Sequence, residues 1–209
     1  MLKAPWFEDI EFKDFPYYGW SVNSTSFDNW QRVALSTTSS ISGQHAMTIF
    51  NSAGNAGARY QLISPSFDLS NIANPVISFM YAFAQRVGAG GQGTNDQLIV
   101  YTSEDCGQTW RSQWSDNGSD LQTTGSGTST SNLPFVPASS ASWRLVSRGL
   151  NLTNKSNVRF RFEFRSAGGN NIYLDAINVG FTLANNNAFE NSANFNVYPN
   201  PASSFATVS

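Results

Sequence analysis

Asp175 is the residue of this sequence whose surroundings most clearly indicate a chemical role. It lies in residues 172–179, where Tyr173, Ile177 and Val179 share its strand parity and are largely apolar. A carboxylate on such a face is costly unless a hydrogen-bonding partner or a cation compensates for the loss of water. The pattern therefore predicts that Asp175 has a hydrogen-bonding partner or binds a cation.

Few other residues could support catalysis. The chain has one histidine, His45, and one cysteine, Cys106, which cannot build a zinc site with the usual ligand count. Neither a His-Glu-x-x-His nor a Gly-x-Ser-x-Gly sequence occurs, so the zinc-protease and α/β-hydrolase signatures are both missing. We expect His45 to lie in a sheet. We expect Cys106 to be a buried, inert residue, with pairing to a thiol outside this chain as the alternative.

Two further chemistries rest on residue types that are common in this chain. A carboxylate pair for glycoside hydrolysis could be assembled from several acids, but any fourteen acids allow such pairings. A carbohydrate-stacking platform could be built from tryptophans, although most of them occupy expected strand positions and so favour the core. The acids are Glu8, Glu11, Asp96, Glu104, Asp105 and Glu163, and the tryptophans are Trp20, Trp30, Trp110, Trp114 and Trp143.

Composition and charge limit the possible functions. The 209 residues are enough for one β-sandwich domain, and charged residues make up only 12% of them. A net charge of -2 provides no basic field for a phosphate backbone, so we expect no nucleic-acid partner. No apolar run approaches the ~18 residues of a membrane span. The N-terminal residues also lack the pattern of a signal peptide.

The strands that position Asp175 are predicted from the alternation of apolar and polar residues along the sequence. In residues 158–165, Val158 and three phenylalanines alternate with charged residues, a period of two that predicts a half-buried strand. Residues 167–171 are small and turn-forming, so we expect a hairpin to the strand at 172–179. Other expected strands cover residues 7–12, 20–22, 30–35, 45–50, 60–64, 75–84, 97–102 and 110–114.

Two long connections separate these strands. Residues 87–95 are rich in glycine, and residues 116–142 are rich in Gly, Ser, Thr, Asn and Pro, with a short helical turn expected near residues 134–137. No longer segment has a 3.6-residue apolar period. The sequence therefore predicts an all-β fold, an antiparallel two-sheet sandwich.

Several fragments in order resemble a known group of modules. The chain resembles the jelly-roll modules of secreted Bacteroidetes proteins, which follow the catalytic domain of pappalysin-like metalloproteases, and more distantly the cleaved adhesin domains of gingipains and the MAM domains. The resemblance covers Phe7 to about Val179. The fragments are FEDIEFKDFPYYGW, YQLISPSFDLS, PVISFMYAFA, DQLIVYTSEDCGQTW, WRLVSRGLNL and NVRFRFEFRSAGGNNIYLDAINV.

The end of the chain has a different composition. Residues 184–195 form a polar linker, and NVYPNPA at 196–202 resembles the opening of the C-terminal sorting domain that the type IX secretion machinery reads. We therefore expect a jelly-roll domain at 1–183, a linker at 184–195 and the start of a truncated sorting domain at 196–209. The resemblance implies a secreted or cell-surface location.

The resemblance also implies a structural calcium ion where the first strand meets the last. The family's first-strand glutamate falls on Glu8 and its last-strand aspartate on Asp175, and Asn51 and Asp28 could add side-chain oxygens. Carboxylates and carbonyl oxygens are the ligands that calcium prefers. Gingipain-type modules often carry Asp-x-Asp before the final strand, but Tyr173 stands at the first of these positions, which leaves the number of ligands and the affinity open.

The function expected from this resemblance is binding without catalysis. The chain would be an accessory or adhesin-like module of a surface-associated multidomain protein, a peptidase whose catalytic domain lies outside this sequence. Its partner would be an extracellular protein or glycan, held by the loops 88–95 and 116–140. The alternatives are a carbohydrate-binding module of a secreted glycoside hydrolase and a stand-alone hydrolase.

Overall fold

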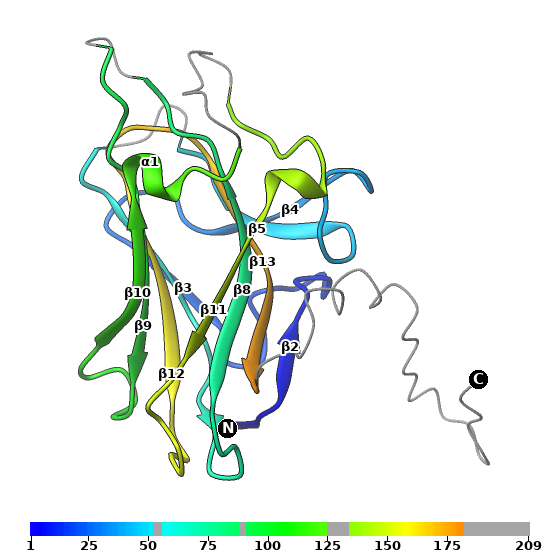
Figure 1. Cartoon of the computed structure of the whole chain (residues 1–209), viewed down its shortest axis with the longest axis vertical. Coiled ribbons are helices and arrows are strands. Elements are labelled where there is room, and N and C mark those ends of the chain that lie inside the picture. Colours follow the sequence, from blue (N-terminus) through cyan, green and yellow to red (C-terminus); the bar gives the residue numbers. More distant parts are fainter. Residues whose placement is uncertain (52–55, 88–90, 125–133, 182–209) are drawn as a thin grey trace, which may run out of the picture.

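A computed structural model describes residues 1–51, 56–87, 91–124 and 134–181, in which nearly all regular structure is β-strand (Figure 1). Two antiparallel sheets pack face to face, so the predicted all-β jelly-roll sandwich is confirmed. The predicted linker and sorting-domain start, 184–195 and 196–209, lie outside the described residues.

The first sheet has five strands in the order β10-β9-β12-β6-β3, all antiparallel. Its central strand β12 carries the alternating phenylalanines of the sequence. The strands are β3 (Ser21–Ser24), β6 (Arg59–Ile63), β9 (Gln97–Ser103), β10 (Arg111–Asn117) and β12 (Arg159–Arg165).

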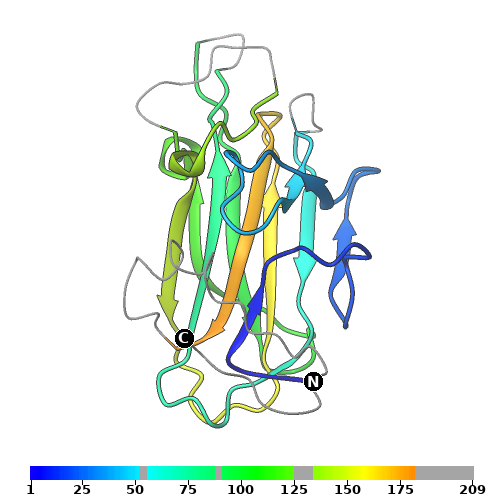
Figure 2. The ribbon, with the colours of Figure 1, turned by 90° about the vertical axis from the view of Figure 1, so that its right-hand side faces the viewer.

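The second sheet contains the strand order β11-β8-β13-β5-β4, and β2 pairs with β13 beside β5. Figure 2 shows β2 in blue next to the lower part of β13 in orange. The strands are β2 (Trp6–Glu8), β4 (Gln31–Ala34), β5 (His45–Ile49), β8 (Val76–Phe83), β11 (Arg144–Gly149) and β13 (Ile172–Gly180). A small parallel pair, β1 (Leu2–Lys3) and β7 (Phe67–Asp68), and two short helices, α1 (Gly118–Leu121) and η1 (Ser140–Ser142), complete the fold.

The main core lies between the two sheets. Phe162 of β12 meets Phe79 of β8 edge to face with ring centroids 5.2 Å apart, and Phe164 packs on Phe83 at 6.3 Å. These side chains are fully buried. Four of the five tryptophans considered for a sugar platform are also buried, as predicted, although Trp114 alone among them lies within a strand. They are Trp20, Trp30, Trp114 and Trp143.

The two sheets differ in what covers their outer faces. Every residue of β8 and β13 is buried, because the segments near Ser39 and Phe135 fold over the outer face of the second sheet. Trp143 belongs to this second, smaller core and donates its indole N–H to the Ser39 carbonyl at 2.8 Å. On the outer face of the five-stranded sheet, strand residues remain accessible in alternation.

Three sequence-based expectations were wrong in detail. β12 and β13 do not form a hairpin, because they lie in different sheets and residues 166–171 cross from one sheet to the other. Not all charged side chains of β12 face water, because Glu163 is 2% exposed under neighbouring arginines. The helical turn expected near 134–137 is replaced by α1 and η1 on either side of it. In the described residues, no helix is long and apolar enough to cross a membrane.

Candidate functional site

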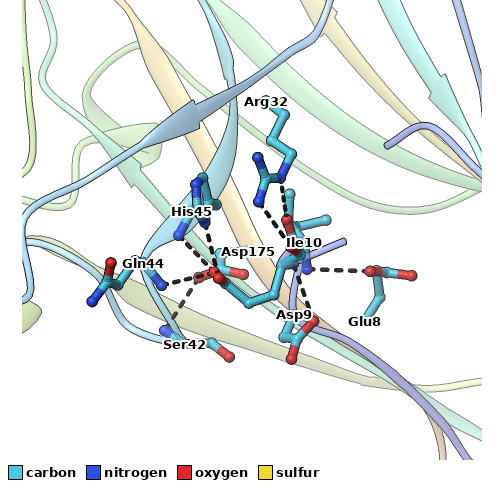
Figure 3. A network of polar contacts seen from close by, with 9 residues as sticks. Glu8, Asp9, Ile10, Arg32, Ser42, Gln44, His45 and Asp175 are labelled. Atoms are coloured by element: carbon cyan, nitrogen blue, oxygen red, sulfur yellow. Dashed lines mark hydrogen bonds and ion pairs between the residues drawn. The ribbon is translucent and has the colours of Figure 1, made fainter. Parts of the chain in front are cut away.

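Glu8 lies on β2 and Asp175 on β13, and these two strands are paired. Glu8 stands opposite Ile177, and Asp175 precedes an irregularity in β13 that ends at Asn178. Both carboxylates are removed from water, with exposed fractions of 1% for Glu8 and 0% for Asp175. In the view of Figure 3, Asp9 and Ile10 lie between them.

The turn after β2 is shaped around the Glu8 carboxylate. The amide of Ile10 donates to Glu8 Oε1 at 3.2 Å, and the Tyr17 hydroxyl lies 3.3 Å from Glu8 Oε2. Burial raises the pKa of Glu8, although these hydrogen bonds oppose the shift. Ile10 has a φ of +61°, which is strained for a β-branched residue and persists only where the surrounding contacts determine it.

Asp175 is a buried carboxyl group with no ion-pair partner among the described residues. Its Oδ1 accepts from the Ala176 amide at 2.6 Å and its Oδ2 from the Ser42 amide at 3.2 Å. No ion pair between described residues involves Asp175. Burial raises the pKa of Asp175 well above its ordinary value, and the negative charges of Asp9 and Glu11 raise it further.

Glu11 holds the turn against β4 and β5. Its carboxylate accepts from the backbone amides of Gln44 and His45 at 2.7 Å each, and it lies 2.9 Å from the His45 ring nitrogen Nδ1 (Figure 3). Although burial acts in the opposite direction, these bonds hold the pKa of Glu11 below its ordinary value. Arg32 donates to the carbonyl oxygens of Ile10 and Glu11 at 2.7 and 2.8 Å, so its guanidinium group fastens the backbone of this turn.

The donors at this site have the chemistry that calcium prefers. Calcium takes six to eight oxygen ligands, and carboxylates mixed with backbone carbonyls are typical. Within the described ranges, however, no three histidine, cysteine or carboxylate side chains converge into a metal cluster. A cation held by Glu8 and Asp175 would therefore need backbone carbonyl oxygens as well.

The structure does not bring Asn51 and Asp28 to this site. Asn51 donates its side-chain amide to Asp96 at 2.9 Å and accepts from the Ser166 hydroxyl at 2.7 Å, so its polar atoms serve another cluster. Asp28 is exposed on the connection between β3 and β4, where its charge adds to burial in raising the pKa of Tyr60. Adding these two residues to the ligand set was wrong because sequence separation gives no information on which end of the sandwich a loop occupies.

Asp96 organises the loop end of the molecule, which sequence reasoning missed. Its Oδ1 accepts from the side chain of Asn51, the Ala167 amide at 2.8 Å and the Gly169 amide at 3.2 Å, so one carboxylate joins three distant segments. Its backbone carbonyl also accepts from the Gly118 amide at 2.9 Å. From the sequence, Asp96 was only one of several acids that could have formed a carboxylate pair, and no local pattern distinguished it from the others.

The described parts of the loops predicted to bind a ligand, residues 91–95, 116–124 and 134–140, lie at this same end (Figure 1). Of the expected surface, residues 88–90 and 125–133 lie outside the described residues. The described flanks are held by hydrogen bonds, with Asn117 donating to the Asn95 side chain at 2.8 Å and the Thr94 amide to the Arg86 carbonyl at 2.8 Å. These hydrogen bonds tie the described flanks to neighbouring residues.

His45 lies in a strand, whereas Cys106 lies on an exposed turn. His45 lies in β5, as predicted, and bonds to Glu11. Cys106 is exposed at the turn between β9 and β10, with a φ of +61°, so the expectation that it is buried was wrong. A lone cysteine is a small apolar side chain by default, but here the turn conformation places it outside the core.

Comparisons with known proteins show which fold this chain has, but they assign it to no family. No family model matches the sequence, and no curated protein does. Among solved structures, the K1 cleaved adhesin domain of Lys-gingipain from Porphyromonas gingivalis W83 is 13% identical with a TM-score of 0.61, covering 86% of this chain and 99% of that one. The K2 domain of Lys-gingipain is 16% identical with a TM-score of 0.56, over 86% and 99% of the two chains. The K3 domain from the same strain is 13% identical with a TM-score of 0.55, over 84% and 98%. The chain is thus similar in fold to entire cleaved adhesin domains.

Proposed function

We propose that this chain is a noncatalytic, adhesin-like binding module of a secreted, surface-associated protein. The observation that carries the proposal is the fold likeness to the K1 cleaved adhesin domain, which is matched over 99% of its length. Fold alone does not determine function, so the site must support the assignment. The support from the site is the loop end, where Asp96 holds three segments together beneath the long connections.

The cellular context is a second part of the proposal. The parent protein is a multidomain peptidase, and residues 196–202 are the start of a sorting signal for the type IX secretion machinery. What supports this is the NVYPNPA sequence, which follows a polar linker. The proposal places the module outside the cell, on the surface or released from it.

The third part of the proposed function is a calcium ion. We propose that Glu8 and Asp175, with backbone carbonyl oxygens, hold one structural calcium ion. The buried Asp175 charge, which no cationic side chain of the described residues compensates, supports this, as do the strained turn at Ile10 and the acids around it. When bound, the ion would neutralise these carboxylates and tie the first strand to the last.

The binding function is tested by presenting the full chain to arrays of extracellular proteins and of glycans. Saturable retention on at least one array is the expected result. Hydrolysis of peptide or glycoside panels by the pure chain would contradict a noncatalytic module and would favour the stand-alone hydrolase. Retention on neutral polysaccharides, lost on changing an exposed aromatic residue, would favour the carbohydrate-binding alternative.

A further inference from the structure

The outer face of the five-stranded sheet concentrates positive charge. The phenylalanines of β12 face the core, so Arg159, Arg161 and Arg165 point to the opposite side, and the register places Arg59 of β6 beside Arg165. These are four of the twelve Lys and Arg residues in a chain whose net charge is -2. Glu163 is the only acid at the outward positions of the five strands.

Arg161 is held in place by two aromatic rings. Its guanidinium carbon lies 4.3 Å from the ring centroid of Tyr101 and 4.5 Å from that of Trp110. Its side chain is only 15% exposed, and its Nε is buried without a hydrogen-bond partner. Stacking of this kind fixes the plane of the guanidinium group. The group is therefore oriented before any ligand arrives.

Glu163 forms ion pairs with two of the arginines, Arg161 and Arg165. Arg165 Nε lies 2.7 Å from Glu163 Oε1, and Gln61 donates to the other carboxylate oxygen at 2.7 Å. Arg165 also donates to the Tyr101 hydroxyl at 2.9 Å. Glu163 offsets one of the four positive charges, so the outward strand positions of this face keep an excess of arginines.

Uncharged polar side chains flank the arginines. The outward positions of the edge strands β3 and β10, and one end of β9, carry hydroxyl and amide groups, which hydrogen-bond to sugar hydroxyls as donors and acceptors. They are Ser21, Asn23, Gln97, Ser112, Ser115 and Asn117. The face therefore combines spaced guanidinium groups with a neutral hydrogen-bonding border.

We propose that this face binds a carboxylated polysaccharide, a chain with spaced uronic-acid groups, laid across β12 with Arg161 and Arg165 at its carboxylates. The inference rests on the proposed binding function and names its ligand class. Guanidinium groups match carboxylates in charge and in bidentate geometry. The small number of charges and the neutral border suit a polymer of moderate charge density, whereas a phosphate backbone would need a stronger basic field.

The test uses the full chain and polygalacturonate, with the carboxyl-reduced polymer of the same length as its neutral counterpart. Isothermal titration should show binding to polygalacturonate that weakens with added salt, and no measurable binding to the reduced polymer. The Arg161→Gln variant should weaken binding about tenfold or more. Arg161→Gln also removes a neighbour of Glu163. The Arg59→Gln/Arg159→Gln double variant is therefore measured too, because Arg159 donates to Ser66 and not to Glu163.

Arg148→Gln is the matched control, because Arg148 is exposed on β11 of the other sheet. It removes one positive charge and should leave the affinity unchanged. The inference is overturned if Arg148→Gln weakens binding as much as Arg161→Gln, if the reduced polymer binds equally well, or if an acidic peptide or a second copy of the chain occupies the face in preference. Absence of polygalacturonate binding by the folded chain also overturns it. Retention on the protein or neutral-glycan arrays would then still support the proposed binding function, so the two failures are distinguishable.

Discussion

The Glu11 carboxylate lies 2.9 Å from the His45 imidazole and accepts two backbone amides of the same segment. Glu11 thereby links the turn after β2 to β5 and positions the backbone close to Asp175. Glu11 is thus a positioning residue, and the calcium ion that we propose is assigned to Glu8 and Asp175.

Calcium should stabilise the chain. At a free concentration about 100-fold above the dissociation constant, binding to the folded state alone adds about 2.7 kcal/mol to the free energy of unfolding. We expect a higher thermal midpoint with calcium than with chelator, and no such difference in Asp175→Asn. An unchanged midpoint together with no bound metal by elemental analysis would reject the site.

The pH dependence of the calcium-free chain should show two opposite trends. Glu11 has a lowered pKa when folded, so its contribution is present above its ordinary value of 4.5 and is lost as pH falls through the lowered pKa. Asp175 has a raised pKa, so the folded state favours its protonated form, and stability falls as pH rises above 3.8 through the raised value.

Urea unfolding across the acid-to-neutral range measures both trends. Asp175→Asn should reduce the loss of stability toward neutral pH, leaving the part that the raised pKa of Glu8 causes, and saturating calcium should reduce the loss in the unmodified chain. A calcium-free chain whose stability rises steadily up to neutral pH would contradict the unpaired charge of Asp175.

Gly169→Ala should destabilise the loop end. A Cβ at this position would lie 1.8 Å from Asp96 Oδ2 and 2.4 Å from Thr94 Oγ1, so the buried cluster must move. Overpacking of this kind typically costs about 1–3 kcal/mol. Gly149→Ala is the control, since nothing lies within 4 Å of its added carbon. Equal unfolding midpoints in urea for the two variants would contradict the tight packing at Asp96.

Phe162→Ala should be among the most damaging core changes. The ring is fully buried and meets Phe79 between the two sheets, and removal of a buried phenylalanine ring costs about 3–5 kcal/mol. Phe27→Ala removes the same atoms from a side chain that is fully exposed and should change the free energy of unfolding little. A small effect of Phe162→Ala in chemical denaturation would count against the sheet packing described above.

Native Cys106 should react with a thiol reagent without unfolding. The side chain is exposed at the tip of the β9–β10 turn, although Asn157 donates a hydrogen bond to its sulfur at 3.1 Å. Labelling of the folded chain at a rate close to that of the denatured chain is the expected result. Labelling only in denaturant would show that the turn is buried in solution.

The sequence by itself determined most of the strands and the class of fold, although it did not predict β1, β7 or β11. The alternation of phenylalanine and charged residues in 158–165 is a local property, and it predicted both β12 and the outward direction of its arginines. It also showed that Asp175 stands on an apolar strand and needs a partner. These predictions succeeded because side-chain direction in a strand depends only on position along the chain.

Only the tertiary structure decided which segments meet. Residues 166–171 looked like a hairpin turn but cross between sheets, because turn residues permit a reversal without choosing the partner strand. Likewise, the side chain of Asn51 donates a hydrogen bond to Asp96 and does not join Glu8. The rings of Tyr101 and Trp110 lie against the guanidinium group of Arg161 because of how β9, β10 and β12 are paired. These contacts join residues tens of positions apart, and the packing of the whole sandwich selects among the alternatives that local pattern leaves equal.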